Sequence, residues 1–184
     1  IVMTRGRNFS DNSVLATDLT GSFGTEQLVV LIDEFTASAS EIFAGAIQDN
    51  DRGLIIGRRS FGKGLVQRSF DMPDSSQIRL TVQRYYTPSG RCIQKGYTPG
   101  KNVDYESEIL ERYNRGEVFS ADSMRRDSTD VYRTRHGREV FGGGGIIPDI
   151  FVPSDTSGVT NYYVAVANAG LLQKFAYEYC DLNR

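Results

Sequence analysis

Two short runs of aliphatic residues, 28–32 and 54–57, flank a segment with apolar residues at helical spacing. A continuous aliphatic run is typical of a strand buried on both faces of a sheet. Four apolar side chains between residues 41 and 50 share one helical face, which predicts a helix there. A strand, a helix and a strand within about 30 residues form a βαβ crossover unit.

Polar and apolar residues alternate in the segments that follow. Residues 65–70 and 77–86 predict an antiparallel pair of strands, joined by a turn over residues 72–76. Residues 101–141 carry mixed charges and few aliphatic side chains, which predicts a partly helical insertion at the surface, with a helical turn at 107–113.

Four consecutive glycines at 142–145 predict a hinge before an edge-like strand over residues 146–153, which prolines bracket. Apolar residues at helical spacing predict a final helix within residues 161–179. No internal repeat or clean boundary divides the chain, so we expect a single α/β domain over residues 1–184.

Composition narrows the classes of function. The 184 residues contain 21 Lys and Arg against 23 Asp and Glu, a balance that gives no electrostatic reason to expect a nucleic-acid partner. Cys92 and Cys180 lack the spacing of a zinc or iron–sulfur site. We interpret them as unpaired, with a disulfide as the alternative. His136 is the single histidine, so a hydrolase that does not use it needs another base.

The segment T-A-S-A-S-E, residues 36–41, stands where a predicted strand leads into a predicted helix. A serine hydroxyl there lies beside the free N–H groups and positive dipole end of the helix, which stabilise an oxyanion. Nucleophile elbows use the same arrangement, although the G-x-S-x-G spelling is absent. The alternative is a capping box, because Ser38 and Glu41 match S-x-x-E without any catalysis.

The segment G-R-R-S-F-G-K-G, residues 57–64, nearly spells a phosphate-binding loop, but Gly64 stands where that loop needs Ser or Thr. Flanking glycines also let Lys63 approach another group closely, and a desolvated lysine can act as a general base. Gln67 lies on the same side of an extended chain and can orient the Lys63 amine. A solvated loop lysine and a strand glutamine without a role are the simpler interpretations. A helix-start serine, a lysine and an amide together predict a Ser/Lys hydrolase that needs no histidine.

The ordered succession T-A-S-A-S-E, S-F-G-K-G and R-Y-Y-T-P-S-G within residues 28–98, followed by I-I-P-D, resembles the carboxyl-terminal processing peptidases of the S41 serine peptidase family. These are also called tail-specific proteases. The resemblance implies Ser38 as nucleophile, Lys63 as general base and Gln67 as its support. The Ala39 N–H would form half of the oxyanion hole. The implied fold is a crotonase/ClpP-like mixed β-sheet core of ββα-type units packed by helices.

The resemblance further implies cleavage of proteins or peptides at or near non-polar, unstructured C-terminal regions through an acyl-enzyme, with no metal or organic cofactor and no nucleic acid. It implies a bacterial cell-envelope enzyme, periplasmic or membrane-associated, and a homo-oligomer is compatible with it. Because the chain begins at Ile1, we expect a catalytic-core fragment, with the PDZ domain and the glycine for the other half of the oxyanion hole upstream. The alternatives are a non-catalytic peptide-binding scaffold on the same fold and a nucleotide phosphohydrolase, which an extended chain after Gly64 would exclude.

Overall fold

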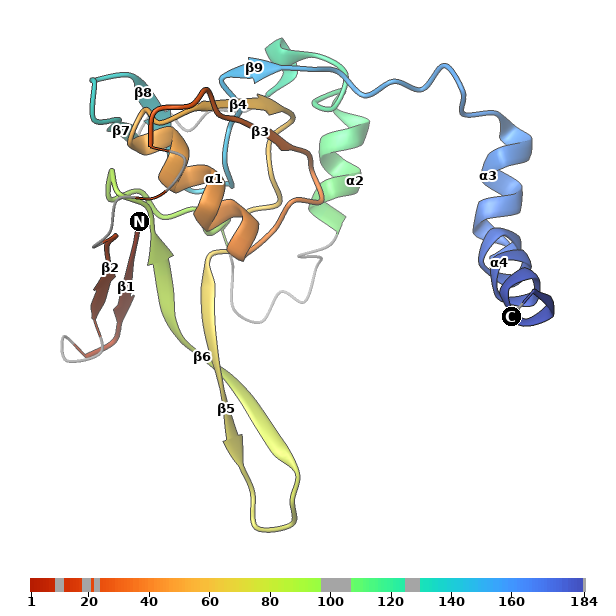
Figure 1. Cartoon of the computed structure of the whole chain (residues 1–184), viewed down its shortest axis with the longest axis horizontal. Coiled ribbons are helices and arrows are strands. Elements are labelled where there is room, and N and C mark those ends of the chain that lie inside the picture. The colour runs from red at the N-terminus through yellow and green to blue at the C-terminus, as the bar shows by residue number, and fades with distance from the viewer. Residues whose placement is uncertain (9–11, 18–20, 22–23, 97–106, 125–129, 184) are drawn as a thin grey trace. The chain divides into compact units, whose positions relative to one another are not determined.

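The computed structural model describes residues 1–8, 12–17, 21, 24–96, 107–124 and 130–183. Their contacts divide the chain into two compact units, Ile1–Pro153 and Ser154–Arg184, and each is described by itself. Figure 1 shows the helices and strands, which form a mixed α/β structure.

A parallel sheet in the order β3-β4-β9 carries the predicted βαβ unit. The helix α1 connects β3 to β4 and begins two residues earlier than the pattern indicated. The prediction of a strand, a helix and a strand is confirmed. The bounds are β3 Val29–Ile32, α1 Ala39–Asp49, β4 Leu54–Gly57 and β9 Ile150–Phe151.

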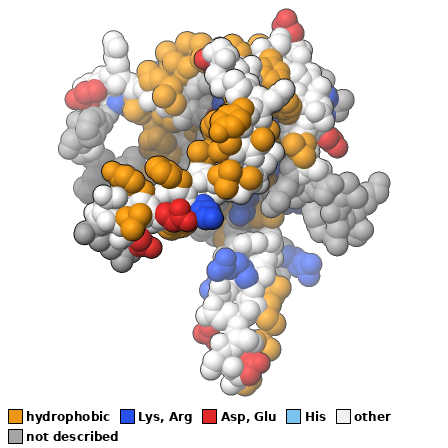
Figure 2. Space-filling model, turned by 90° about the vertical axis from the view of Figure 1, so that its right-hand side faces the viewer, with side chains coloured by type: hydrophobic (Ala, Val, Ile, Leu, Met, Phe, Trp, Pro, Cys, Tyr) orange, Lys and Arg blue, Asp and Glu red, His pale blue; other side chains and the backbone are white. Residues whose placement is uncertain are grey.

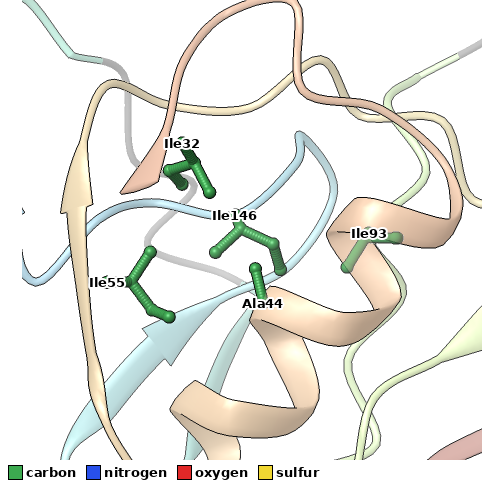
Figure 3. Close-up of a cluster of buried hydrophobic side chains, with 5 residues drawn as sticks. All are labelled: Ile32, Ala44, Ile55, Ile93 and Ile146. Atoms are coloured by element: carbon green, nitrogen blue, oxygen red, sulfur yellow. The ribbon is translucent and has the colours of Figure 1, made fainter. Parts of the chain in front are cut away.

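The hydrophobic core lies between this sheet and α1. Ile32 from β3, Ile55 from β4 and Ala44 from α1 meet two residues from connecting segments, Ile93 and Ile146 (Figure 3). Burying an isoleucine side chain contributes about 1.5–3 kcal/mol. The core therefore fixes α1 and the segments around residues 93 and 146 against one face of the sheet.

The opposite face of the β3-β4-β9 sheet is apolar but exposed. Val29 pairs with Leu54, and Leu31 pairs with Ile56, which in turn pairs with Ile150. Paired residues share a face in a parallel sheet, and on this face Leu31 is 77% exposed. The prediction of a strand buried on both faces is therefore wrong within the described residues.

A second sheet is antiparallel, in the order β2-β1-β6-β5. The predicted hairpin is confirmed as β5 and β6, which extend away from the βαβ unit and carry hydrophobic and basic side chains (Figures 1 and 2). The side chains at 67–81 are all exposed. The bounds are β1 Val2–Gly6, β2 Ser13–Leu15, β5 Leu65–Asp71 and β6 Gln77–Tyr86.

The charged segment contains the predicted helical turn, as α2. Residues such as Leu110 and Tyr113 of this segment are exposed, but two of its charged side chains are buried, because Arg112 is 1% exposed and Glu117 is 2% exposed. Residues 101–106 and 125–129 of the predicted insertion lie outside the described residues. The elements are α2 Ser107–Asn114, the 3-10 helix η2 Ala121–Ser123 and the antiparallel strands β7 Val131–Arg133 and β8 Glu139–Phe141.

The second unit contains two helices where the pattern predicted one, α3 Asn161–Asn168 and α4 Leu171–Leu182. The Thr160 hydroxyl caps α3 by accepting a hydrogen bond from the Tyr163 N–H at 3.1 Å. Gly170 separates the helices with a φ of 66°, a left-handed conformation that breaks the helical path. Within the described ranges, every helix is too short or too polar to cross a bilayer.

Candidate active site

Ser38 occupies the turn between β3 and α1, where the sequence places the candidate nucleophile. It is the N-cap residue of α1, with φ 59° and ψ −118°. A residue with a side chain rarely adopts a positive φ, and such strain costs about 1–3 kcal/mol and clusters at functional sites. The strained strand-to-helix turn is the local geometry of a nucleophile elbow.

The capping box predicted from S-x-x-E is present, and its Glu41 carboxylate does more than cap the helix. This side chain is fully buried. One oxygen, Oε2, accepts hydrogen bonds from the N–H groups of Ser38 at 2.9 Å and Lys63 at 2.8 Å. The other, Oε1, accepts from the Ser60 hydroxyl at 2.5 Å and the Gly62 N–H at 2.7 Å. Glu41 therefore joins the backbone at the candidate nucleophile to the backbone at the candidate base.

The loop that carries Lys63 leaves β4 and is held by further bonds. The Phe61 N–H donates to the Thr36 carbonyl at 2.9 Å, which joins the loop to the turn before Ser38. The Ser60 hydroxyl accepts from the Ile146 N–H at 2.7 Å. A Cβ on Gly64 would come within 2.9 Å of the Gln94 backbone nitrogen, so this glycine permits a close approach.

Lys63 and Ser38 are both half-buried, and Gln67 is exposed on β5. The ladder register between β5 and β6 shifts next to Gln67, between it and Val66. In the part of the chain that the structure describes, no hydrogen bond joins the side chains of Ser38, Lys63 and Gln67. The structure thus brings the Ser38 and Lys63 backbones together without a direct side-chain bond.

Ala39 is the first residue of α1 and is exposed. The N–H of a first helical residue has no intrahelical acceptor and points out of the helix N-terminus. A free N–H of this kind is what a contribution to an oxyanion hole requires, and the role of Ala39 stays a prediction.

The phosphate-loop alternative is excluded by the chain after Gly64. This chain continues as the strand β5, whereas a phosphate loop leads into a helix whose N-terminus binds the phosphate.

Cys92 and Cys180 are free thiols, and burial raises the pKa of Cys92. The His136 side chain is exposed. Within the described ranges, no three His, Cys, Asp or Glu side chains are grouped to hold a metal ion.

The model of peptidase family S41 matches residues 1–103. The chain belongs to this family. The resemblance seen in the sequence is thereby confirmed.

Relatives within the S41 family include a carboxy-terminal-processing protease of Bartonella bacilliformis, 42% identical over 127 residues, which are 68% of this chain and 29% of the relative. A chloroplastic C-terminal processing peptidase of Tetradesmus obliquus is 52% identical over 80 residues, 43% of this chain and 17% of the relative. The solved structure of a photosystem II D1 C-terminal processing protease aligns with a TM-score of 0.42 at 31% identity, covering 73% of this chain and 24% of that one. The chain thus spans less than a third of the length of these relatives.

The sequence names Ser38 and Lys63 as candidates but does not reveal the link between them. The S-x-x-E pattern predicts only a cap for Glu41, and no pattern predicts a role for Ser60. The signal for a wider role was weak, because S-x-x-E is common at helix starts and the bonds to Ser60 and Lys63 span 19 and 22 positions.

Proposed function

We propose that the chain is the catalytic core of a serine endopeptidase with a Ser38/Lys63 dyad. The observation that carries the proposal is the pair of N–H groups on one Glu41 oxygen, from a strained helix-start serine and a glycine-flanked lysine. Membership of peptidase family S41 supports the same chemistry. A scaffold without catalysis would need neither the strain at Ser38 nor this link.

In the proposed reaction, the neutral amine of Lys63 takes the proton from the Ser38 hydroxyl as Oγ attacks a peptide carbonyl carbon. The Ala39 N–H at the start of α1 donates to the resulting oxyanion. The Lys63 ammonium then returns its proton to the leaving amine, and an ester to Ser38 remains. Lys63 next takes a proton from the water that attacks the ester, and it returns this proton to the Ser38 Oγ as the acid leaves. The missing side-chain bond is compatible with this order, because catalytic hydrogen bonds often tighten only with substrate bound.

The role of Gln67 is to orient the Lys63 amine once that side chain turns toward Ser38. The relatives' names as C-terminal processing proteases support protein or peptide substrates cut at or near non-polar, unstructured C-terminal regions. Processing enzymes of bacteria and chloroplasts among them support a place outside the cytoplasm, in the cell envelope. We also propose that the mixed α/β structure of this chain has the crotonase/ClpP-like arrangement.

The decisive experiment compares Ser38→Ala, Lys63→Ala and Lys63→Arg with the parent in the full-length gene product, using an unfolded protein as substrate. Each variant should lose cleavage by about 10³-fold or more, since arginine keeps the charge but cannot give up its proton. Lys174→Ala, at an exposed lysine of α4, should cleave like the parent. Parental rates in any of the three variants would refute the dyad. Substrate binding without cleavage by the parent would support the scaffold.

A further inference from the structure

A buried cluster of charged side chains lies beside the Lys63 loop. Arg112, at the end of α2, donates from Nη1 to the Ser60 carbonyl at 3.0 Å and from Nη2 to the Arg59 carbonyl. Its Nε donates to Glu117 at 2.8 Å. One side chain therefore binds the two successive carbonyls that lead into the candidate base loop.

Glu117 holds this arrangement from the other side. Its Oε1 accepts from Arg59 Nε at 2.6 Å as well as from Arg112, and its Oε2 accepts from Arg59 Nη2 at 3.1 Å. Arg59 in turn donates to the Gly144 carbonyl at 3.0 Å. Removing one partner from a buried ion pair leaves an uncompensated charge and is strongly destabilising, so the three side chains hold each other in place.

The carbonyls bound by Arg112 are continuous with the link to the nucleophile. Ser60, whose carbonyl Arg112 binds, donates through its hydroxyl to Glu41. Glu41 accepts from the N–H groups of Ser38 and Lys63. A path of hydrogen bonds thus runs from α2 to both members of the proposed dyad. Arg112 lies outside residues 1–103, the part that the family model matches.

We propose that Arg112 is a positioning residue for the Lys63 loop, which it fixes from the charged segment through the carbonyls of Arg59 and Ser60. The proposal rests on the proposed function. Arg112 touches neither substrate nor the reacting atoms. It acts by holding the backbone from which Lys63 reaches Ser38, and displacements of about 1 Å at such a position can slow a reaction 10²-fold.

The test replaces the guanidinium with an amine in Arg112→Lys, in the full-length gene product. Lysine keeps the charge beside Glu117 but loses the planar fork that binds two carbonyls at once. We expect kcat on a peptide substrate to fall by about tenfold to 100-fold while KM stays within about threefold. Acylation of Ser38 by a fluorophosphonate probe should slow by the same factor.

Arg115→Lys is the matched control. Arg115 lies in the same segment at 3.6 Å from Glu117, and its ion pairs go to Glu111 and Glu117. It should keep parental kcat and labelling. If Arg112→Lys does not fold, as judged by its thermal transition, Glu117→Gln is measured in the same way and should show the same loss of kcat at constant KM.

The outcomes separate the two proposals. If Ser38→Ala abolishes labelling and cleavage but folded Arg112→Lys or Glu117→Gln retains parental kcat, the positioning role is refuted and the dyad stands. The positioning role is also refuted if Arg112→Lys raises KM without lowering kcat, or if Arg115→Lys lowers kcat by the same factor. Labelling and cleavage that persist in Ser38→Ala refute the proposed function itself.

Discussion

Ser38 combines a side chain with a backbone conformation that favours glycine. Its φ of 59° and ψ of −118° lie outside the regions that residues with a side chain ordinarily adopt, which costs about 1–3 kcal/mol. Nothing in the capping role needs that conformation, since ordinary N-cap residues adopt extended dihedral angles. The strain is therefore better explained by a requirement on where the hydroxyl points than by the stability of α1.

This strain predicts different stabilities for two variants at Ser38. Ser38→Gly should be more stable than Ser38→Ala by about 1 kcal/mol, because glycine accepts a positive φ and is also the better N-cap residue. Urea unfolding of both proteins measures the difference. Equal stabilities, or a more stable alanine variant, would mean that the turn relaxes and that Ser38 is not held under strain.

For single residues, the sequence indicates which ones are candidates for the site but not which hydrogen bonds connect them. Ser38 and Lys63 stand out because their neighbours, a helix start and two glycines, are adjacent in the chain. The hydrogen bonds of Glu41 to Ser60, Gly62 and Lys63 join positions about 20 residues apart, so no local pattern reveals them. The full burial of Glu41 was equally hidden, because an isolated acidic residue is usually exposed.

Among the connecting elements, the four-glycine segment, predicted as a hinge, packs closely against the loop that carries Lys63. The Gly145 N–H donates to the Ile93 carbonyl at 2.9 Å, and the next residue, Ile146, enters the core. A Cβ on Gly145 would lie 2.7 Å from the Ser60 carbonyl oxygen and 2.8 Å from its hydroxyl. Only a residue without a side chain lets this segment meet Ser60 so closely.

Two glycine substitutions distinguish the cost of a steric clash from the cost of a positive φ. Gly145→Ala and Gly143→Ala both place a side chain at a positive φ, but the added Cβ at Gly143 meets only Asp130 Oδ2, at 3.5 Å. Gly145→Ala should therefore cost at least about 2 kcal/mol more than Gly143→Ala, as overpacking against backbone does. Denaturant titration of the two variants provides the comparison. Similar losses of unfolding free energy in the two variants would show that the backbone at Ser60 shifts to accept the added Cβ without a measurable loss of stability.

Elements were predicted well where the signal is local. The βαβ unit and the β5–β6 hairpin follow from periodicity and turn residues, and both are confirmed. The burial of β3 on both faces was predicted wrongly, and the burial of Arg112 and Glu117 within the charged segment was not predicted. An aliphatic run does not reveal how many faces other elements cover, and a charged segment does not reveal that its charges pair with each other inside the protein.

Across the first unit as a whole, buried charges link segments that are distant in sequence. Arg91, fully buried, bonds to Asp49 of α1 at 2.7 Å and to the Phe141 carbonyl of β8 at 3.0 Å. Arg59, Arg112 and Glu117 link the β4–β5 loop to α2. Because these links need charged partners, the stability of the unit should depend on pH.

Glu117 sets the direction of that dependence. Burial raises the pKa of its carboxyl, but hydrogen bonds and charges from Arg59 and Arg112 outweigh burial and hold the pKa below its ordinary value of 4.5. Its contribution to stability is therefore complete above pH 4.5 and is lost as the pH falls through the folded-state pKa.

Glu117→Gln should accordingly lower the melting temperature at neutral pH and also flatten its fall on acidification. Thermal scans between about pH 6 and about pH 3 measure both effects. Glu139→Gln, at an exposed position of β8, is the control and should follow the parent curve. A variant curve parallel to that of the parent would show that Glu117 does not cause the acid sensitivity.

The single carboxylate of Glu41 also has a consequence for motion. Since it holds the peptide units of Ser38, Gly62 and Lys63 at once, opening either the start of α1 or the lysine loop breaks hydrogen bonds to the carboxylate that also holds the other. We therefore expect the fluctuations of the two segments to be coupled. The two members of the proposed dyad would then leave and regain their positions together.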